Sequence, residues 1–120
     1  MRRGEIWTVA GAKDYAGKPR PVVIIQDDAF DSTESVTICA FTTNLAEAPL
    51  IRIVVDPSEL NGLVKTSRLM ADKITTVAKS KICVRIGRLE HEDMLRLDRA
   101  MLAFLGLAAP PTQRPAAQNM

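Results

Sequence analysis

The chain has little of what several common kinds of protein chemistry require. Its 120 residues include one histidine, His91, so catalysis that depends on a pair of histidines is excluded. The two cysteines, Cys39 and Cys83, stand within apolar strand patterns and lack Cys-x-x-Cys or Cys-His spacing. We therefore expect two buried thiols that form no disulfide and bind no metal. The prediction is a protein without a metal site or any other cofactor.

Long hydrophobic runs are also absent from the chain. No apolar segment approaches the ~20 residues that a membrane-spanning helix needs, and the N-terminus lacks the hydrophobic region of a signal peptide. We therefore expect a cytoplasmic protein without a membrane partner. The net charge of +2 excludes a general polyanion binder, so any nucleic-acid surface must come from local clustering. Basic residues cluster at 65–88, where a solvated face of mixed charge is an equally good interpretation.

Length and composition indicate one folded domain. A chain of 120 residues can bury one core but is short for two, and 47% hydrophobic residues with 25% charged residues are typical of a globular protein. Residues 108–120 are rich in alanine and proline and carry few side chains that could be buried. We therefore expect a domain over 1–107 and a disordered tail over 108–120.

Short β-branched segments predict a mainly β domain. Strands are expected at 5–10, 22–26, 36–41, 50–55, 68–71 and 82–85. The apolar run at 22–25 does not alternate with polar residues, which predicts a strand covered on both faces. Residues 56–62 have the composition of a turn. The spacing of these segments is typical of a small barrel.

The last element is different, because its apolar residues recur at helical spacing. A helix is predicted from Glu90 to Leu105, with acidic residues in its first turn and Gly106 as its C-terminal stop. Leu95, Leu102 and Leu107 form a second apolar face on this helix. That face indicates either contact with another subunit or a thick core. His91 is interpreted as an exposed residue at the start of the helix.

One arginine stands at the start of the buried strand. Pro19 and Pro21 restrict the backbone on either side of Arg20 and keep it extended, which predicts a preorganised guanidinium at the strand end. The strand at 36–41 leads into the polar residues Thr42, Thr43 and Asn44. An arginine and hydroxyl groups at two strand ends are suited to bind a phosphodiester.

Five segments, in order, resemble the MazF/PemK toxins, which are endoribonucleases of toxin–antitoxin pairs. The matching segments are 3–7 (RGEIW), 18–24 (KPRPVVI), 40–44 (AFTTN), 69–74 (LMADKI), and 85–89 (RIGRL) followed by the helix that ends at 104–107 (FLGL). The resemblance extends over residues 2–107. It implies an SH3-like small barrel of the CcdB/MazF type with a C-terminal helix.

The resemblance also implies an activity. A toxin of this family is a sequence-specific, metal-independent endoribonuclease that cleaves single-stranded RNA, whether messenger, ribosomal or transfer RNA. Its products carry 2′,3′-cyclic phosphate and 5′-hydroxyl ends. The implied partners are a second copy of the chain and a cognate MazE-like antitoxin, which binds through its acidic C-terminal segment. Contact with DNA is implied through the antitoxin alone.

The family's catalytic pair corresponds to Arg20 and Thr42. Arginine is suited to clamp the phosphate and to stabilise its growing charge, whereas its pKa, above roughly 12, makes it a poor proton acceptor. A strand-end threonine that binds its own backbone is the alternative interpretation of Thr42. The residues expected to bind RNA are Tyr15, Lys18, Thr43, Asn44, Ser67, Asp72 and Lys73. Among these, Asp72 and Lys73 are of the types that read base edges.

The first loop, at 10–16, differs from the family pattern. It is shorter than in many members and lacks their acidic residue, although Tyr15 could stack on a base.

Two other functions are considered. One is a CcdB-like gyrase-inhibiting toxin without nuclease activity, which would act through C-terminal residues and would lack the arginine and threonine pair. The other is an inactive RNA-binding barrel.

Overall fold

A single curled sheet and one helix make up the part of the fold that the structure describes. The computed structural model describes residues 1–10, 19–44 and 51–108. Its strands are β1 (Glu5–Val9), β2 (Arg20–Ile24), β3 (Ser35–Thr42), β4 (Arg52–Val55), β5 (Ser67–Ala78) and β6 (Ile82–Arg88). Short 3-10 turns, η2 (Asp28–Phe30) and η3 (Lys79–Lys81), and the helix α1 (His91–Phe104) complete the described elements. The prediction of a mainly β domain with a C-terminal helix is confirmed.

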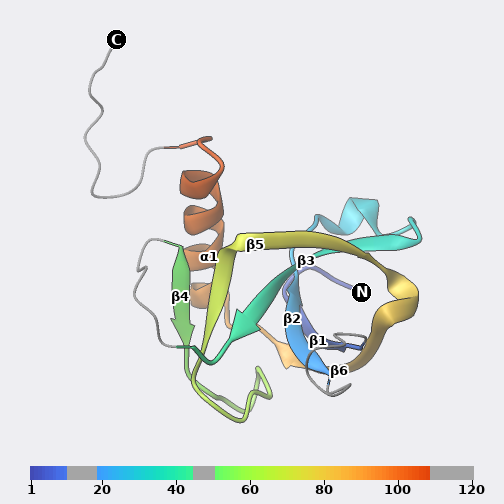
Figure 1. The fold of residues 1–120 in the computed structure, drawn as a ribbon, viewed down its shortest axis with the longest axis horizontal. Coiled ribbons are helices and arrows are strands. Elements are labelled where there is room, and N and C mark those ends of the chain that lie inside the picture. The colour runs from blue at the N-terminus through green and yellow to red at the C-terminus, as the bar shows by residue number, and fades with distance from the viewer. Residues whose placement is uncertain (11–18, 45–50, 109–120) are drawn as a thin grey trace.

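The strands pair in the order β4-β5-β3-β2-β1-β6, and each pair is antiparallel. Figure 1 shows β5 first running beside β4 and α1, then bending and arching over the other strands toward β6. The bend has a cause in the pairing with β3. Cys39 pairs with Ile74 and Phe41 with Leu69, so two steps along β3 correspond to five along β5. The additional residues of β5, Met70 to Lys73, form a corner.

Two strand predictions were too short. The strand expected at 68–71 continues through the charged residues at 72–73 to Ala78, because the corner turns it onto the first half of β3. Its second half contains Ile74, Thr75, Thr76 and Val77, which favour strands. The strand expected at 82–85 extends to Arg88 through pairing with β1. The strand expected at 22–26 instead runs from Arg20 to Ile24.

Both faces of β2 are buried, as predicted. Val23 belongs to the core between the sheet and α1, where it is fully buried together with Ile6 and Leu97. Val22 and Ile24 belong to a second core with Val36 and Ile38. These will be called the helix-side core and the inner core. The sequence Val22-Val23-Ile24 lacks alternation because each face of the strand has a core to fill.

The helix begins and ends close to its predicted limits. Glu90 is its N-cap and Gly106 has a φ of 76°, the left-handed conformation that ends many helices. Leu97 and Ala100 are buried against the sheet, whereas Leu95 and Leu102 are exposed by about two fifths. Phe104 and Leu105 are exposed as well. The second apolar face is therefore outside the core of this chain.

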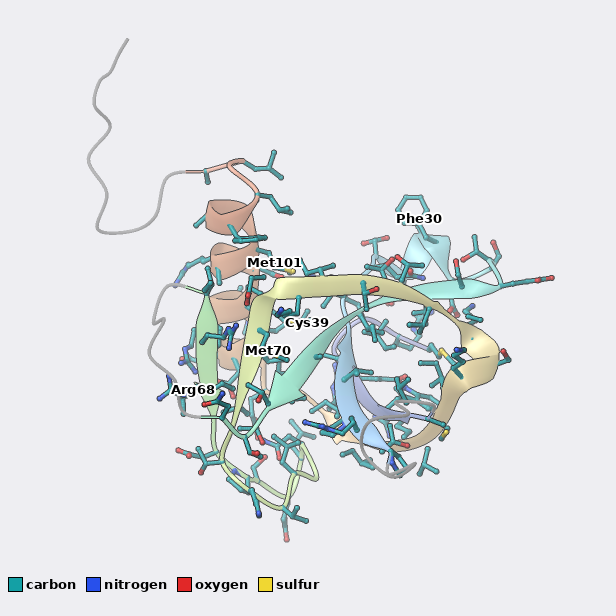
Figure 2. The ribbon with its side chains drawn as sticks, in the orientation of Figure 1. Phe30, Cys39, Arg68, Met70 and Met101 are labelled. Carbon is teal, nitrogen blue, oxygen red and sulfur yellow. The ribbon has the colours of Figure 1, made fainter. Side chains whose placement is uncertain are left out.

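The two cysteines have different environments, so the prediction that both are buried is wrong for Cys83, which is exposed on β6. Cys39 is fully buried, and its thiol donates to the carbonyl oxygen of Met70 at 3.2 Å (Figure 2). Met70 lies in the corner of β5, where β3 has no backbone partner for it. The thiol thus satisfies a carbonyl group that the corner separates from β3.

We expect the two thiols to react at very different rates. Burial raises the pKa of Cys39 to about 12, so its reactive thiolate is scarce at neutral pH and is also inaccessible. A thiol reagent added to the native protein at pH 7.5 should modify one cysteine per chain rapidly, and a second after denaturation. Cys83→Ser should abolish the rapid phase. A rapid phase that persists in Cys83→Ser would contradict the burial of Cys39.

Several predicted features lie outside the described residues. These are Tyr15 in the first loop, Lys18 just after that loop, and the tail from residue 109 onward.

Candidate RNA-cleavage site

The predicted catalytic residues, Arg20 and Thr42, lie on adjacent strands. Arg20 is the first residue of β2 and Thr42 the last of β3, and both are half-buried. Val22 pairs with Ala40 and Ile24 with Ile38. Continuing this antiparallel register by two residues sets Arg20 opposite Thr42. Residues that face each other in this way project from the same face of the sheet, with Cβ atoms about 5 Å apart.

A second arginine lies on the other side of Thr42. Arg68, the second residue of β5, pairs directly with Thr42. Three adjacent strands therefore present Arg20, Thr42 and Arg68 in one line, which we call the strand-end row. Val22 and Ala40, the neighbours of this row on the same face, contact or belong to the inner core. The sequence analysis counted Arg68 among the basic residues but did not identify it as a site residue.

The hydroxyl group of Thr42 is held by the following turn. Its Oγ1 accepts a hydrogen bond from the backbone N–H of Asn44 at 3.1 Å. This contact corresponds to the alternative interpretation, in which a strand-end threonine binds its own backbone. It does not exclude a role in catalysis, because the hydroxyl hydrogen is still available for donation to an anion. The hydrogen bond from Asn44 fixes the orientation of the Thr42 oxygen.

Asp72 and Lys73 lie at the corner of β5. Both carboxylate oxygens of Asp72 are bound by Arg52 of β4, with Oδ1 2.9 Å from Nε and Oδ2 3.0 Å from Nη2. The Arg52 guanidinium holds the pKa of Asp72 below its usual value, and the carboxylate raises the pKa of Arg52. Lys73 is exposed. The carboxylate is therefore fixed and ionised, while the ammonium group faces solvent.

Thr43 and Ser67 lie on the opposite face from the strand-end row. Both line a pocket of about 310 Å³ that also includes Pro21 and the loop residues from Gly62 to Lys65. Ser67 is buried, and its hydroxyl donates to the carbonyl oxygen of Lys65 at 2.9 Å. The predicted RNA-binding residues thus divide between two faces at the same end of the sheet. Asn44 is exposed beside them.

The basic segment at 65–88 does not form one continuous positive surface. Lys79 pairs with Asp31, and Arg85 lies 3.2 Å from Glu5 Oε2. Burial opposes the ionisation of Glu5, but hydrogen bonds from the Arg2 N–H and the Trp7 indole, with the charge of Arg85, lower its pKa overall. Several basic residues of this segment thus belong to a surface of mixed charge.

The remaining expectations from the sequence concern His91, metal binding and membrane-spanning helices. His91 is the exposed first residue of α1, as expected. Within the described ranges, no group of three or more histidine, cysteine or acidic residues is arranged to hold a metal ion. No helix among the described residues is long and apolar enough to cross a membrane.

Comparison with solved structures identifies the class of fold. An endoribonuclease in complex with its cognate antitoxin from a mycobacterial species superposes with a TM-score of 0.77 at 24% identity, covering 92% of this chain and 99% of that one. A MazE–MazF structure from Deinococcus radiodurans superposes with a TM-score of 0.72 at 15% identity, covering 90% and 97%. These MazF toxins have the SH3-like barrel fold, so the predicted fold is confirmed.

Sequence comparison then identifies the family. Residues 2–105 match the family model described as PemK-like, MazF-like toxin of type II toxin–antitoxin systems, and the chain belongs to this family. It is 56% identical over 108 residues to the probable endoribonuclease MazF of Mycolicibacterium smegmatis. That alignment covers 90% of this chain and 99% of the relative. The resemblance found in the sequence is confirmed.

Proposed function

We propose that this MazF-type endoribonuclease toxin cleaves single-stranded RNA at specific sequences, without a metal ion, and that the strand-end row holds the scissile phosphate. The observation that carries the proposal is the β2–β3 register, which pairs Val22 with Ala40 and, continued by two residues, sets Arg20 opposite Thr42. One cation and one hydroxyl donor on the same face can bind two oxygens of a phosphate. Unpaired bases near them would remain accessible to the polar residues around the row.

The reaction is an internal displacement at phosphorus. The ribose 2′-oxygen loses its proton and bonds to phosphorus, while the bond to the 5′-oxygen breaks and that oxygen gains a proton. The products are a 2′,3′-cyclic phosphate and a 5′-hydroxyl. Arg20 stabilises the negative charge that grows on the phosphate oxygens, since its high pKa makes it a poor base. Thr42 donates its hydroxyl hydrogen to the same phosphate.

Base recognition is assigned to the residues around the row. Lys73 can donate to guanine, and the Asp72 oxygens can accept from the amino group of cytosine or adenine, because each oxygen bound by Arg52 has further acceptor capacity. The pocket beside Thr43 and Ser67 offers an apolar surface for a base. Lys18, Tyr15 and Asn44 complete the proposed RNA-binding residues.

The test is cleavage of a long RNA of mixed sequence by the purified protein in EDTA. We expect discrete products with 5′-hydroxyl ends at a shared sequence. Treatment with polynucleotide kinase under phosphatase-free conditions should label these ends directly. RNA that stays intact would contradict the proposal and would be the result expected of a CcdB-like gyrase inhibitor. Cleavage that disappears in EDTA would contradict metal independence.

The proposed partners follow from the same surface. A MazE-like antitoxin would place its acidic C-terminal segment on the basic groups that bind RNA, so that binding of the two is mutually exclusive and weakened by salt. DNA would be contacted through the antitoxin. We further propose that the toxin acts in the cytoplasm, where messenger, ribosomal and transfer RNA are present.

A homodimer is proposed through the exposed apolar face of α1. Met101, Leu102 and Leu105 line a pocket of about 350 Å³, bordered by Arg3 and Asp98, whose Nη2 and Oδ1 atoms are 2.6 Å apart. Leu102→Lys would place a charge in this apolar contact and should weaken dimerisation at least tenfold, by about 1.4 kcal/mol or more. Sedimentation across a concentration series should detect the change.

The matched control for this prediction is Phe30→Lys. Phe30 is also a large, exposed apolar residue, but it lies on η2, away from α1 (Figure 2). This variant should sediment as the wild type does. A wild-type chain that is monomeric at micromolar concentration would contradict the proposed dimer. Equal weakening by the two substitutions would contradict an interface on α1.

A further inference from the structure

Arg52 of β4 binds Asp72 of β5, a residue that the proposed function assigns to base recognition. We propose that Arg52 is a positioning residue that sets sequence preference: it holds the Asp72 carboxylate in one orientation, in which the carboxylate selects adenine or cytosine over uracil. This inference rests on the proposed endoribonuclease function. It adds to that function a residue that acts through Asp72 and the class of base that the pair accepts.

The strand register places Arg52 and Asp72 on the face of the sheet that points away from α1. Ile53 pairs with Leu69, and both belong to the helix-side core. Arg52 pairs with Met70, which Figure 2 labels on β5, so these two residues project from the opposite face. Asp72 lies two residues beyond Met70 and is the diagonal neighbour of Arg52. A long side chain can reach such a neighbour across two strands.

The same face carries the strand-end row. Phe41 pairs with Leu69 on the helix side, so the next pair, Thr42 and Arg68, projects from the face of Asp72. Four residues of β5 separate Arg68 from Asp72, which corresponds to at most about 13 Å along the strand. A base close to the cleaved bond can therefore reach the carboxylate while the scissile phosphate is held at the row.

The contact between Arg52 and Asp72 leaves the carboxylate little freedom. Nε lies 2.9 Å from Oδ1 and Nη2 lies 3.0 Å from Oδ2, so the guanidinium and the carboxylate share two parallel hydrogen bonds. The two side chains are only 17% and 18% exposed. The carboxylate cannot rotate without breaking both bonds, and its orientation is thus set before RNA binds.

A carboxylate held in this way discriminates between bases. Its two oxygens offer about four acceptor sites, of which Arg52 occupies two. The hydrogen bonds from Arg52 are the largest cause that lowers the pKa of Asp72, so the group stays ionised and only accepts. Adenine and cytosine present an exocyclic amino group to such an acceptor, whereas uracil presents a carbonyl oxygen, which the negative charge repels.

The first test removes that amino group from the RNA. At one position of the mapped site, the wild-type protein should cleave RNA with adenine or cytosine at least about tenfold more efficiently, in kcat/KM, than RNA with uracil. Purine in place of adenine, or 2-pyrimidinone in place of cytosine, should lower kcat/KM about tenfold for the wild type but less than about threefold for Asp72→Ala. Equal losses for the two proteins would overturn the inference.

The second test changes Arg52. Arg52→Lys keeps the positive charge but cannot form two parallel hydrogen bonds, so the preference at this position should fall below about threefold while the other positions are unchanged. Exchanging the pair, with Arg52→Asp and Asp72→Arg, restores the ion pair but places a donor at position 72. The exchanged protein should favour uracil or guanine. Wild-type preference in either protein would show that the pair is only structural.

Arg96→Lys is the matched control. The Nη1 atom of Arg96 lies 2.7 Å from Asp93 Oδ1 and 2.9 Å from the carbonyl oxygen of Val54. The control thus alters an arginine–carboxylate contact that also touches β4. It should keep the wild-type preference at every position. If Arg96→Lys relaxes the preference as much as Arg52→Lys does, the effect comes from movement of β4 and the inference is overturned.

Failure of the inference can be told apart from failure of the proposed function. If Arg20→Ala loses cleavage while Arg52→Lys keeps the wild-type preference, the inference fails and the proposed function stands. If the wild-type protein leaves RNA intact, the proposed function fails and the inference fails with it.

Discussion

Replacing Arg20 with alanine is expected to lower the rate of RNA cleavage by at least about 10²-fold, because a preorganised charge at the transition state is lost. Arg20 is held between Pro19 and Pro21 at the first position of β2, opposite Thr42. It belongs to neither the helix-side core nor the inner core. The melting temperature of the variant should therefore stay within a few degrees of the wild-type value.

The measurement is the single-turnover rate on an oligonucleotide that contains the mapped site. Arg20→Lys should recover part of the activity, since it restores the charge but not the planar, bidentate donor. Arg99→Ala on α1 removes an arginine from the exposed surface and should cleave at the wild-type rate. Wild-type cleavage by a folded Arg20→Ala protein would end the assignment of this residue to catalysis.

Replacing Gly62 with alanine is expected to lower the free energy of unfolding by about 3 kcal/mol or more. Gly62 has a φ of 71°, and a Cβ atom there would lie 2.1 Å from the carbonyl oxygen of Ile86 in β6. That oxygen belongs to backbone, so the loop at 56–62 would have to move away from the sheet. Denaturant unfolding at a fixed protein concentration measures the loss.

Gly106 offers a matched control for the crowding at Gly62. Its φ of 76° is nearly the same, but no atom lies within 4 Å of the position that a Cβ would take. Gly106→Ala should therefore lower the free energy of unfolding only by the cost of placing alanine in a left-handed backbone conformation, about 1 kcal/mol. The difference between the two variants isolates the steric contact with Ile86. Equal losses in both variants would show that the loop does not approach β6 as closely as described.

The sequence predicted most accurately the features that depend on residues close together in the chain. The run Val22-Val23-Ile24 predicted a strand buried on both faces, and the structure places one core against each face. The helical spacing and Gly106 predicted α1 to within a residue at each end. Two prolines predicted that Arg20 stands at the start of a strand. Each of these inferences needs only neighbours in the chain.

Features that depend on pairing between distant strands were not predictable. The strand at 68–71 seemed to end at Asp72, because the sequence does not reveal that Arg52 on β4 neutralises this carboxylate. Arg68 was not identified because its position opposite Thr42 depends on the register between β3 and β5. Cys83 has apolar neighbours in the sequence, yet it lies on a strand at one edge of the sheet and is exposed. In each case the missing information is the register.

The bond from the Cys39 thiol to the Met70 carbonyl makes this cysteine a reporter of barrel opening. The thiol lies between β3 and the corner of β5, so no reagent can reach it until these two strands separate. Its slow reaction therefore follows the same logic as amide hydrogen exchange, in which the rate reflects the population of an open state. In a Cys83→Ser background, one reaction rate would give the free energy of opening at the corner of β5, which adjoins the proposed RNA site. Ligands that bind across β3 and β5 would slow it in proportion to their affinity for the closed barrel.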